Sequence, residues 1–358
     1  MRRRELLVGT SVIGSLAALD LQAATSSRPR RPTLNRVPTR IAFGSCARQN
    51  KPQPIWDAIN ELQPELFIFL GDNIYADTRN MNILQATYQL FARQPGFRRL
   101  CERTPVLATW DDHDYGEDDA GAEYPMKVQS QKMFCDFWAE ASDSPRRTRD
   151  GIYDAVTLRE GNHALQIILP DLRFNRTPLP RTKTYGSGGL GPFARNANPG
   201  ATMLGERQWK WLETVLRTPA DLRIFASSLQ VVADTTGWEA WINFPEDHRR
   251  LLDTIRRERA HGLFCISGDT HYGELSRLSD KVPYPLWDMT SSGLTEVWDQ
   301  RPPNKHRLGN IMRETNFGWI EIDWRNPNIE VLLQIRSGRG EVRIEQRINA
   351  RQLRVANA

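Results

Sequence analysis

The apolar segment Leu66–Leu70 constrains the fold of this chain more than any other stretch. It is too short for a buried helix, it is rich in aromatic side chains, and it ends abruptly at Gly71 and Asp72. An uninterrupted apolar run of this kind predicts a strand covered on both faces, as in the sheet of an α/β protein. Ligands of such sheets bind beyond the carboxyl ends of the strands. Asp72 is therefore a candidate site residue, although a single Gly-Asp pair after a strand is more often an ordinary turn.

Three further predicted strands end in reactive side chains. The strands at 40–47, 105–110 and 262–267 lead into Cys46, Asp112-His113 and Asp269-x-His271. A helix predicted over 54–62 joins the first of them to Leu66–Leu70, and the right-handed crossover of such a unit sets Cys46 beside Asp72. The three carboxylates among residues 111–114 repel one another unless cations are present. Together the four strand ends predict a metal site.

The rest of the pattern completes an α/β fold. Amphipathic spacing predicts helices over residues 82–93, 97–102, 124–139, 205–217 and 244–258, and apolar runs predict strands over residues 165–170 and 222–227. Alternating segments at 319–324, 329–335 and 342–348 predict three antiparallel strands that complete a second sheet.

Composition indicates a globular protein and is compatible with an anionic substrate. The 358 residues suffice for one large α/β domain or two smaller ones, and 39% apolar with 25% charged residues is average for soluble domains. A formal charge of +5 and a pI near 9.1 suit anionic substrates. The basic residues are scattered rather than gathered in a stripe, so no stable nucleic-acid partner is predicted.

The N-terminus is expected to direct export. Residues 1–24 combine Arg2–Arg4 with a modestly apolar stretch and resemble a twin-arginine signal peptide, while a basic start to a cytosolic chain is the alternative. Residues 25–39 are rich in Pro and Arg and predict a linker before a folded domain over 40–350. We therefore expect export by the twin-arginine (Tat) machinery to the periplasm or beyond the cell. No later segment is apolar enough to span a bilayer.

Other motifs carry weaker signals. The cysteines at 46, 101, 135 and 265 lack CxxC spacing, and a Cys101–Cys135 pairing in an exported protein stays open. Arg173 and Arg176 follow a strand and are candidates to grip a phosphate, with a surface ion pair to Asp171 at least as plausible. Gly186–Gly191 formally matches a nucleotide-binding pattern but follows no strand and opens no helix, so we interpret Gly186–Gly200 as a long, mobile loop.

The combination of donors indicates two adjacent cations. Thiolate, phenolate, carboxylate and imidazole groups suit iron, and an oxygen-only neighbouring site suits calcium, magnesium or manganese. Two cations that share Asp72 would activate water and neutralise charge on both oxygens of an in-line displacement at phosphorus.

Six segments in this order resemble a known family. They are FGSC (43–46), FLGDNIYAD (69–77), ATWDDHDYG (108–116), GERQWKWL (205–212), ISGDTHYGEL (266–275) and MTSSGLT (289–295). The chain resembles the alkaline phosphatase D, or PhoD-like, family of the calcineurin-like metallophosphatases. Cys46 and Asp269 stand where the wider superfamily has histidines, which points to the PhoD-like branch.

The resemblance implies a four-layer α/β/β/α metallophosphatase sandwich and assigns roles to the strand-end residues. It implies an Fe³⁺ site held by Cys46, Asp72, Tyr75, Asp269 and His271. It also implies a second site held by Asp72 and Asp112, for calcium or alternatively magnesium or manganese. Asp112 and His113 would be the catalytic residues, with His113 stabilising the phosphoryl oxygens or protonating the leaving oxygen. Glu117-Asp118-Asp119 departs from the family pattern, in which Asn is common, and leaves the second ligand set open.

We therefore expect an exported, metal-dependent phosphoric-ester hydrolase, an alkaline phosphatase or phosphodiesterase acting on small-molecule, lipid or nucleotide esters. Two alternatives remain, a metal-dependent nuclease on the same scaffold and a catalytically inactive exported metal-binding protein. A serine hydrolase has no support, because no G-x-S-x-G segment follows a strand.

Overall fold

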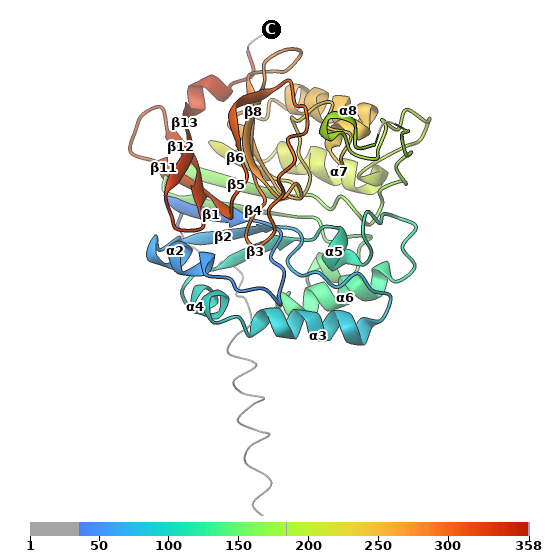
Figure 1. The fold of residues 1–358 in the computed structure, drawn as a ribbon. Coiled ribbons are helices and arrows are strands. Elements are labelled where there is room, and N and C mark those ends of the chain that lie inside the picture. Colours follow the sequence, from blue (N-terminus) through green and yellow to red (C-terminus); the bar gives the residue numbers. More distant parts are fainter. Residues whose placement is uncertain (1–35, 184, 357–358) are drawn as a thin grey trace, which may run out of the picture.

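Two sheets packed face to face form the centre of the molecule, and helices cover their outer faces (Figure 1). The computed structural model describes residues 36–183 and 185–356. The expected signal peptide over 1–24 and the linker up to residue 35 lie outside the described residues. The layers follow the order helix, sheet, sheet, helix, which confirms the four-layer α/β/β/α sandwich.

The first sheet has six strands in the order β13-β12-β11-β1-β2-β3. Their bounds are β1 Arg40–Gly44, β2 Leu66–Leu70, β3 Val106–Thr109, β11 Asn316–Asp323, β12 Glu330–Ser337 and β13 Val342–Asn349. β1, β2 and β3 are parallel, and β11 pairs antiparallel with β1 through the Ala42 and Trp319 positions. The expectation that β11–β13 complete a second sheet is therefore wrong. Alternation along a strand shows which faces are buried, but it does not show which sheet edge the strand joins.

The second sheet has seven strands in the order β10-β8-β9-β7-β6-β5-β4. Their bounds are β4 Asp154–Glu160, β5 His163–Leu169, β6 Leu222–Ala226, β7 Leu263–Ser267, β8 Gly273–Leu278, β9 Leu286–Ser291 and β10 Arg307–Met312. β5, β6, β7 and β9 form its parallel centre. The strands β4, β8 and β10 escaped prediction. β4 and β10 are edge strands with exposed, polar residues, so their apolar pattern is weak.

The helices divide between the two outer faces, as Figure 1 shows. α2, α3, α4 and α6 cover the first sheet, whereas α7 and α8 cover the second. The helices are α2 Ile55–Glu61, α3 Met81–Ala92, α4 Pro95–Arg103, α5 Asp112–Tyr115, α6 Lys127–Phe137, α7 Gly205–Leu216 and α8 Pro245–Arg257.

β2 illustrates how one apolar strand serves two layers. Phe67 and Phe69 pack against Trp56 of α2, at ring distances of 5.5 and 5.8 Å, while Ile68 and Leu70 belong to the core between the sheets. Successive side chains of a strand point to opposite faces, so a strand buried on both sides must be apolar throughout.

Two further features complete the fold. All four cysteines are buried free thiols, so Cys101 and Cys135 are not joined. Within residues 36–183 and 185–356, no helix has both the length and the apolar character needed to cross a bilayer.

Candidate metal centre

The loops that follow β1, β2 and β7 meet at one end of the two sheets. Cys46, Asp72 and His271 place their ligand atoms within 4.8 Å of one another. The hydroxyl of Tyr75 lies 2.9 Å from Nε2 of His271 and 3.4 Å from Oδ2 of Asp72. Four donors of different chemistry, a thiol, a carboxylate, a phenol and an imidazole, therefore surround one point.

A second group of donors shares Asp72. Asp72, Asp112 and His113 form one set with ligand atoms within 4.8 Å, and Asp72, Asp111, Asp112 and Asp269 form another. The structure thus brings together all six residues that were predicted as metal ligands, with Asp72 common to both groups.

Close backbone packing positions these loops. A Cβ on Gly268 would lie 2.5 Å from Oγ of Ser45 and 2.9 Å from the carbonyl oxygen of Leu70, so only glycine lets β7 approach the ends of β1 and β2 this closely. Four of the donor residues also adopt positive φ angles. They are Cys46 at 63°, Asp72 at 48°, Asp269 at 72° and His271 at 59°. Such backbone strain in non-glycine residues concentrates at functional sites.

Several buried carboxylate oxygens lack hydrogen-bond donors. Within the described part of the chain, Oδ1 of Asp72, Oδ2 of Asp111 and Oδ1 of Asp112 accept no hydrogen bond. Each of these carboxylates has a donor on its other oxygen, but a buried oxygen left without one costs free energy unless a donor or a cation reaches it. The donor set and these unpartnered oxygens therefore fit a pair of bound cations.

The pKa values of the carboxyls indicate the same need. Burial, together with nearby Cys46 and Asp112, raises the pKa of Asp72 well above its ordinary value. Burial, Asp111 and Asp112 do the same for Asp269. Without a cation these groups hold protons, because crowded negative charges in a low-dielectric interior disfavour ionisation.

The Cys46 thiol is held by neighbours from both sheets. Its Sγ donates to Oδ2 of Asp72 at 3.3 Å and lies 3.0 Å from Oγ of Ser292, which also accepts from the backbone N–H of His271 at 2.9 Å. Burial raises the pKa of Cys46 to about 12, so its thiolate requires a cation. Ser292, within the segment MTSSGLT that resembles the family, thus contacts Cys46 directly.

His113 lies on α5 at the edge of the donor groups. Its Nδ1 is 2.6 Å from Oδ1 of Asp77, and its ring lies 4.2 Å from the Tyr75 ring, centroid to centroid, at an interplanar angle of 33°. Burial opposes the charge on His113, but Asp112, Asp72 and Asp77 outweigh burial and raise the pKa to about 11. The imidazole therefore carries its proton at neutral pH.

Comparison with known proteins identifies the family. The sequence model described as PhoD-like phosphatase matches residues 41–347. The chain belongs to the PhoD-like phosphatase family. No curated protein sequence matches it.

Solved structures share the PhoD-like fold. A structure of PhoD is similar with a TM-score of 0.63 and 16% identity, over 88% of this chain and 73% of that one. GAP50, the anchor in the inner membrane complex of Plasmodium, gives a TM-score of 0.56 and 13% identity over 88% and 90%. A dimetal phosphatase from Danio rerio gives a TM-score of 0.55 and 14% identity, over 88% of this chain and 100% of that one. At these identities the likeness establishes the fold.

Arg173 and Arg176 of this PhoD-like protein lie in the interior. Arg173 donates from Nε to Asp111 at 2.7 Å and pairs through Nη2 with Glu239 at 2.7 Å, and Nη1 of Arg176 lies 2.7 Å from the other Glu239 oxygen. Neither arginine forms the expected surface ion pair with Asp171, and the two guanidinium groups are 0% and 1% exposed. A direct phosphate contact by them stays a prediction.

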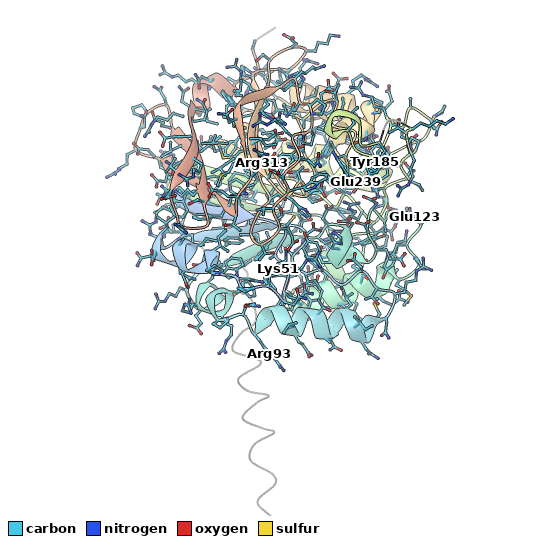
Figure 2. All side chains as sticks on the ribbon, viewed as in Figure 1. Lys51, Arg93, Glu123, Tyr185, Glu239 and Arg313 are labelled. Carbon is cyan, nitrogen blue, oxygen red and sulfur yellow. The ribbon has the colours of Figure 1, made fainter. Side chains whose placement is uncertain are left out.

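The site draws on both halves of the molecule. Lys51 and Glu239 are labelled in Figure 2, Lys51 in the half with α2–α4 and Glu239 in the half with α7 and α8. Lys51 and Arg48 both pair with Glu296, at 2.8 and 3.3 Å, and the Arg48 guanidinium lies 4.1 Å above the ring of Tyr75.

Sequence reasoning missed the supporting residues of the site. They are Arg48, Asp77, Ser228, Glu239 and Glu296. Most of them lie outside the strand-end pattern and gain their place only through contacts between distant loops. Asp118 and Asp119 group with Asp112 within 4.8 Å, whereas Glu117 turns away to pair with Arg79.

Proposed function

We propose that this protein is an exported phosphoric-ester hydrolase with a binuclear metal centre, acting on phosphate mono- or diesters. The observation that carries the proposal is the convergence of five further candidate ligand residues on Asp72, whose buried Oδ1 accepts no hydrogen bond within the described part of the chain. Cys46, Asp72, Tyr75, Asp269 and His271 would hold Fe³⁺. Asp72 and Asp112 would hold calcium, or magnesium or manganese. Such cations, when bound, activate water and neutralise charge on the phosphoryl group.

His113 is the proposed acid of the reaction. Because Asp77 faces its Nδ1, the imidazolium is fixed with Nε2 directed away from Asp77. Oδ1 of the exposed Asp118 lies 3.9 Å from Nε2, beyond hydrogen-bond distance, so this nitrogen can donate to an ester oxygen. Its raised pKa keeps that proton available at neutral and mildly alkaline pH. Asp112 and Asp77 hold the charged ring in place.

Arg48 is the cation that we propose for the phosphoryl group. Its side chain is 36% exposed and lies over Tyr75, next to the donor groups, whereas Arg173 and Arg176 are occupied by buried carboxylates. A guanidinium fork matches the geometry of phosphate oxygens.

Hydrolysis of p-nitrophenyl phosphate and of its bis-ester tests the function. We expect turnover by metallated wild-type protein and its loss in Asp72→Asn. The surface variant Asp57→Asn, whose parent residue pairs only with Arg99 among the described residues, serves as the control. Equal rates in wild type and Asp72→Asn would reject the proposal.

Metal identity and export need separate measurements. Elemental analysis of the purified protein should find iron, and a phenolate-to-Fe³⁺ absorption band should be lost in Tyr75→Phe. A colourless iron-loaded wild type would contradict the Tyr75 assignment. Export should fail in the double variant Arg3→Lys, Arg4→Lys, as measured by fractionation of cells; unchanged export would contradict a twin-arginine signal.

A further inference from the structure

Three aromatic side chains form a row that begins beside the metal centre. Trp298 and Trp238 contact each other edge to face, with ring centroids 4.6 Å apart and an interplanar angle of 81°. Tyr185 continues the row at 6.1 Å from Trp238 and is 64% exposed. Both tryptophans are half-buried. We call Tyr185, Trp238 and Trp298 the aromatic wall.

The wall is attached to the metal centre at two points. The backbone N–H of Trp298 donates to the carbonyl oxygen of His271 at 2.9 Å. Trp238 directly precedes Glu239, whose carboxylate pairs with Arg173 at 2.7 Å. Arg173 in turn reaches Asp111 and lies 3.7 Å from Asp112. The two tryptophans therefore hold fixed positions relative to the candidate metal ligands.

The glycine-rich segment Gly186–Gly191, which resembles a nucleotide loop, packs against Trp238 of this wall. Trp238 donates from Nε1 to the carbonyl oxygen of Gly189 at 3.1 Å, and the N–H of Gly191 donates to Thr236 at 3.1 Å. A Cβ on Gly191 would lie 2.3 Å from the oxygen of Gly237 and 2.5 Å from Cδ2 of Trp238. Gly191 thus has a packing role, because any larger residue would displace the indole.

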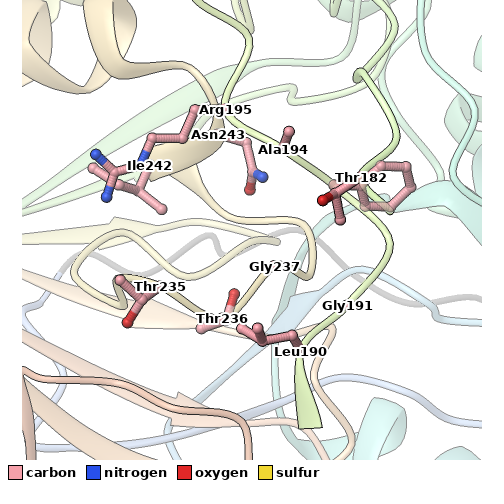
Figure 3. Close-up of a pocket in the computed structure, with 11 residues that line it drawn as sticks. Thr182, Leu190, Gly191, Ala194, Arg195, Thr235, Thr236, Gly237, Ile242 and Asn243 are labelled. Atoms are coloured by element: carbon pink, nitrogen blue, oxygen red, sulfur yellow. The ribbon is translucent and has the colours of Figure 1, made fainter. Parts of the chain in front are cut away.

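A pocket of about 300 Å³ continues from the same loops. Figure 3 shows Leu190, Gly191, Thr236 and Gly237 along one side of it and Ile242 and Asn243 on the other. Its lining mixes apolar groups with threonine hydroxyls. This volume lies at the lower end for small-molecule sites. From His271 through Trp298 and Trp238 to Gly191, the contacts form one continuous path.

We infer that the aromatic wall binds a flat ring on the alcohol part of the ester, so that the preferred substrates are phosphate esters of ring-bearing alcohols. The inference rests on the proposed function. Half-buried tryptophans that are fixed beside a reactive centre keep part of their planar surface accessible, and stacking on such a surface tolerates any aromatic ring. The ring can belong to an aryl alcohol or to a nucleoside, and both present the same flat face.

Hydrolysis of three esters by the metallated full-length protein tests the wall. The esters are p-nitrophenyl phosphate, adenosine monophosphate and glycerol phosphate. Their hydrolysis is measured as the release of inorganic phosphate. In Trp298→Ala we expect kcat/KM for a ring-bearing ester to fall about 10-fold or more, with the glycerol ester within about twofold of wild type. A loss for only one ring ester identifies the ring as aryl or nucleobase. An equal loss for all three esters, or none, would overturn the inference.

Two variants separate recognition from folding. Trp211→Ala removes a half-buried tryptophan on α7 that packs on Tyr153, away from the wall. For each of the three esters, the ratio of its kcat/KM to that of the wild type should stay near one. Gly191→Ala should shift the ratios in the same direction as Trp298→Ala, because it displaces Trp238. Unchanged ratios in both wall variants would contradict the proposal.

A binding measurement keeps the inference separate from the proposed function. Calorimetry on the metal-loaded protein with adenosine, p-nitrophenol and glycerol needs no turnover. Binding of a ring compound that Trp298→Ala weakens about 10-fold or more supports the wall even if no ester is hydrolysed. In that case only the hydrolase proposal fails. Hydrolysis without any ring preference would reject the wall alone.

Discussion

Two groups of buried carboxylates lie side by side in this protein, and they are neutralised differently. In the first, which we call the paired group, Asp111 and Glu239 are matched by Arg173 and Arg176 at distances of 2.7 Å. In the second, the open group of Asp72 and Asp269, no arginine or lysine within the described residues forms an ion pair with either carboxylate, and Oδ1 of Asp72 accepts no hydrogen bond. Burial and neighbouring acidic groups raise the pKa of both carboxyls. Asp112 lies between the groups, 3.7 Å from Arg173.

The difference separates structure from function. Burying a charge is costly, and a chain that needs a carboxylate only for structure can supply its own guanidinium. Asp111 follows this rule, and it also accepts from Ser228 at 2.7 Å. In the open group Asp72 is buried and Asp269 is half-buried, and the free Oδ1 of Asp72 suits a cation from outside. The contrast predicts that removing an acid from the open group lowers metal content and activity but not stability. Removing an acid from the paired group should lower stability but not metal content.

The largest effect is expected in the open group. Asp72→Asn removes the one carboxylate common to both donor sets, so we expect kcat to fall by about 10³-fold or more, with loss of both metals. Because the substitution also relieves crowding among negative charges, the metal-free protein should not lose stability. Elemental analysis, turnover and thermal unfolding measured together check this. Full metal content in the variant would contradict the shared role of Asp72.

Glu239→Gln in the paired group should show the reverse pattern. It leaves Arg173 and Arg176 with a missing buried countercharge, which costs about 3–5 kcal/mol of unfolding free energy. Metal content should be retained. The control Glu206→Gln breaks only an exposed pair with Arg250 and should cost about 1 kcal/mol or less. Denaturant unfolding measures the loss of unfolding free energy in both variants. Equal losses in Glu239→Gln and Glu206→Gln would show that the paired group is not a buried network.

His248 of α8 represents a third solution, a buried group that stays uncharged. Burial lowers its pKa from 6.5 to about 4. As the pH falls, His248 therefore takes up a proton in the unfolded chain before it does so in the folded protein. The free energy of unfolding that it contributes is fully present above pH 6.5 and decreases progressively between pH 6.5 and about pH 4. The loss should reach about 3 kcal/mol.

The comparison of wild type with His248→Gln isolates this contribution. The difference between their unfolding free energies should shift by that amount between pH 7 and pH 4 and stay constant above pH 7. A difference that does not depend on pH would show that the pKa of His248 is the same in the folded and unfolded protein.

The smallest effect is expected at the exposed edge of the open group. Arg48→Ala should raise the inhibition constant of inorganic phosphate about 10-fold while metal content stays the same. Arg93→Ala, an exposed arginine at the end of α3, is the matched control. Arg48→Lys should recover part of the affinity, because it keeps the charge but loses the fork. An unchanged inhibition constant in Arg48→Ala would contradict the proposed contact between Arg48 and the phosphoryl group.

The sequence alone determined the elements that carry the candidate ligands. The strand at Leu66–Leu70, the helix after β1 and the loops with Cys46 and Asp269 follow from short-range rules, because apolar runs, helix periodicity and glycine turns depend on neighbouring residues. The same local order placed the candidate donors at or just after strand ends, and the parallel strands β1, β2 and β3 bring Cys46, Asp72 and Asp112 to one edge of the first sheet. Asp269 and His271 follow β7 of the second sheet and meet the others only through the packing of the two sheets.

Only the tertiary structure decided how the elements join and which charges meet. β11 completes the first sheet instead of the second, because an open strand edge accepts any partner of suitable register. Arg173 meets Asp111 and Glu239, which lie more than sixty residues away on either side, and the aromatic wall unites three separate loops. Contacts of this range are selected by the packing of the whole chain, so no local pattern records them.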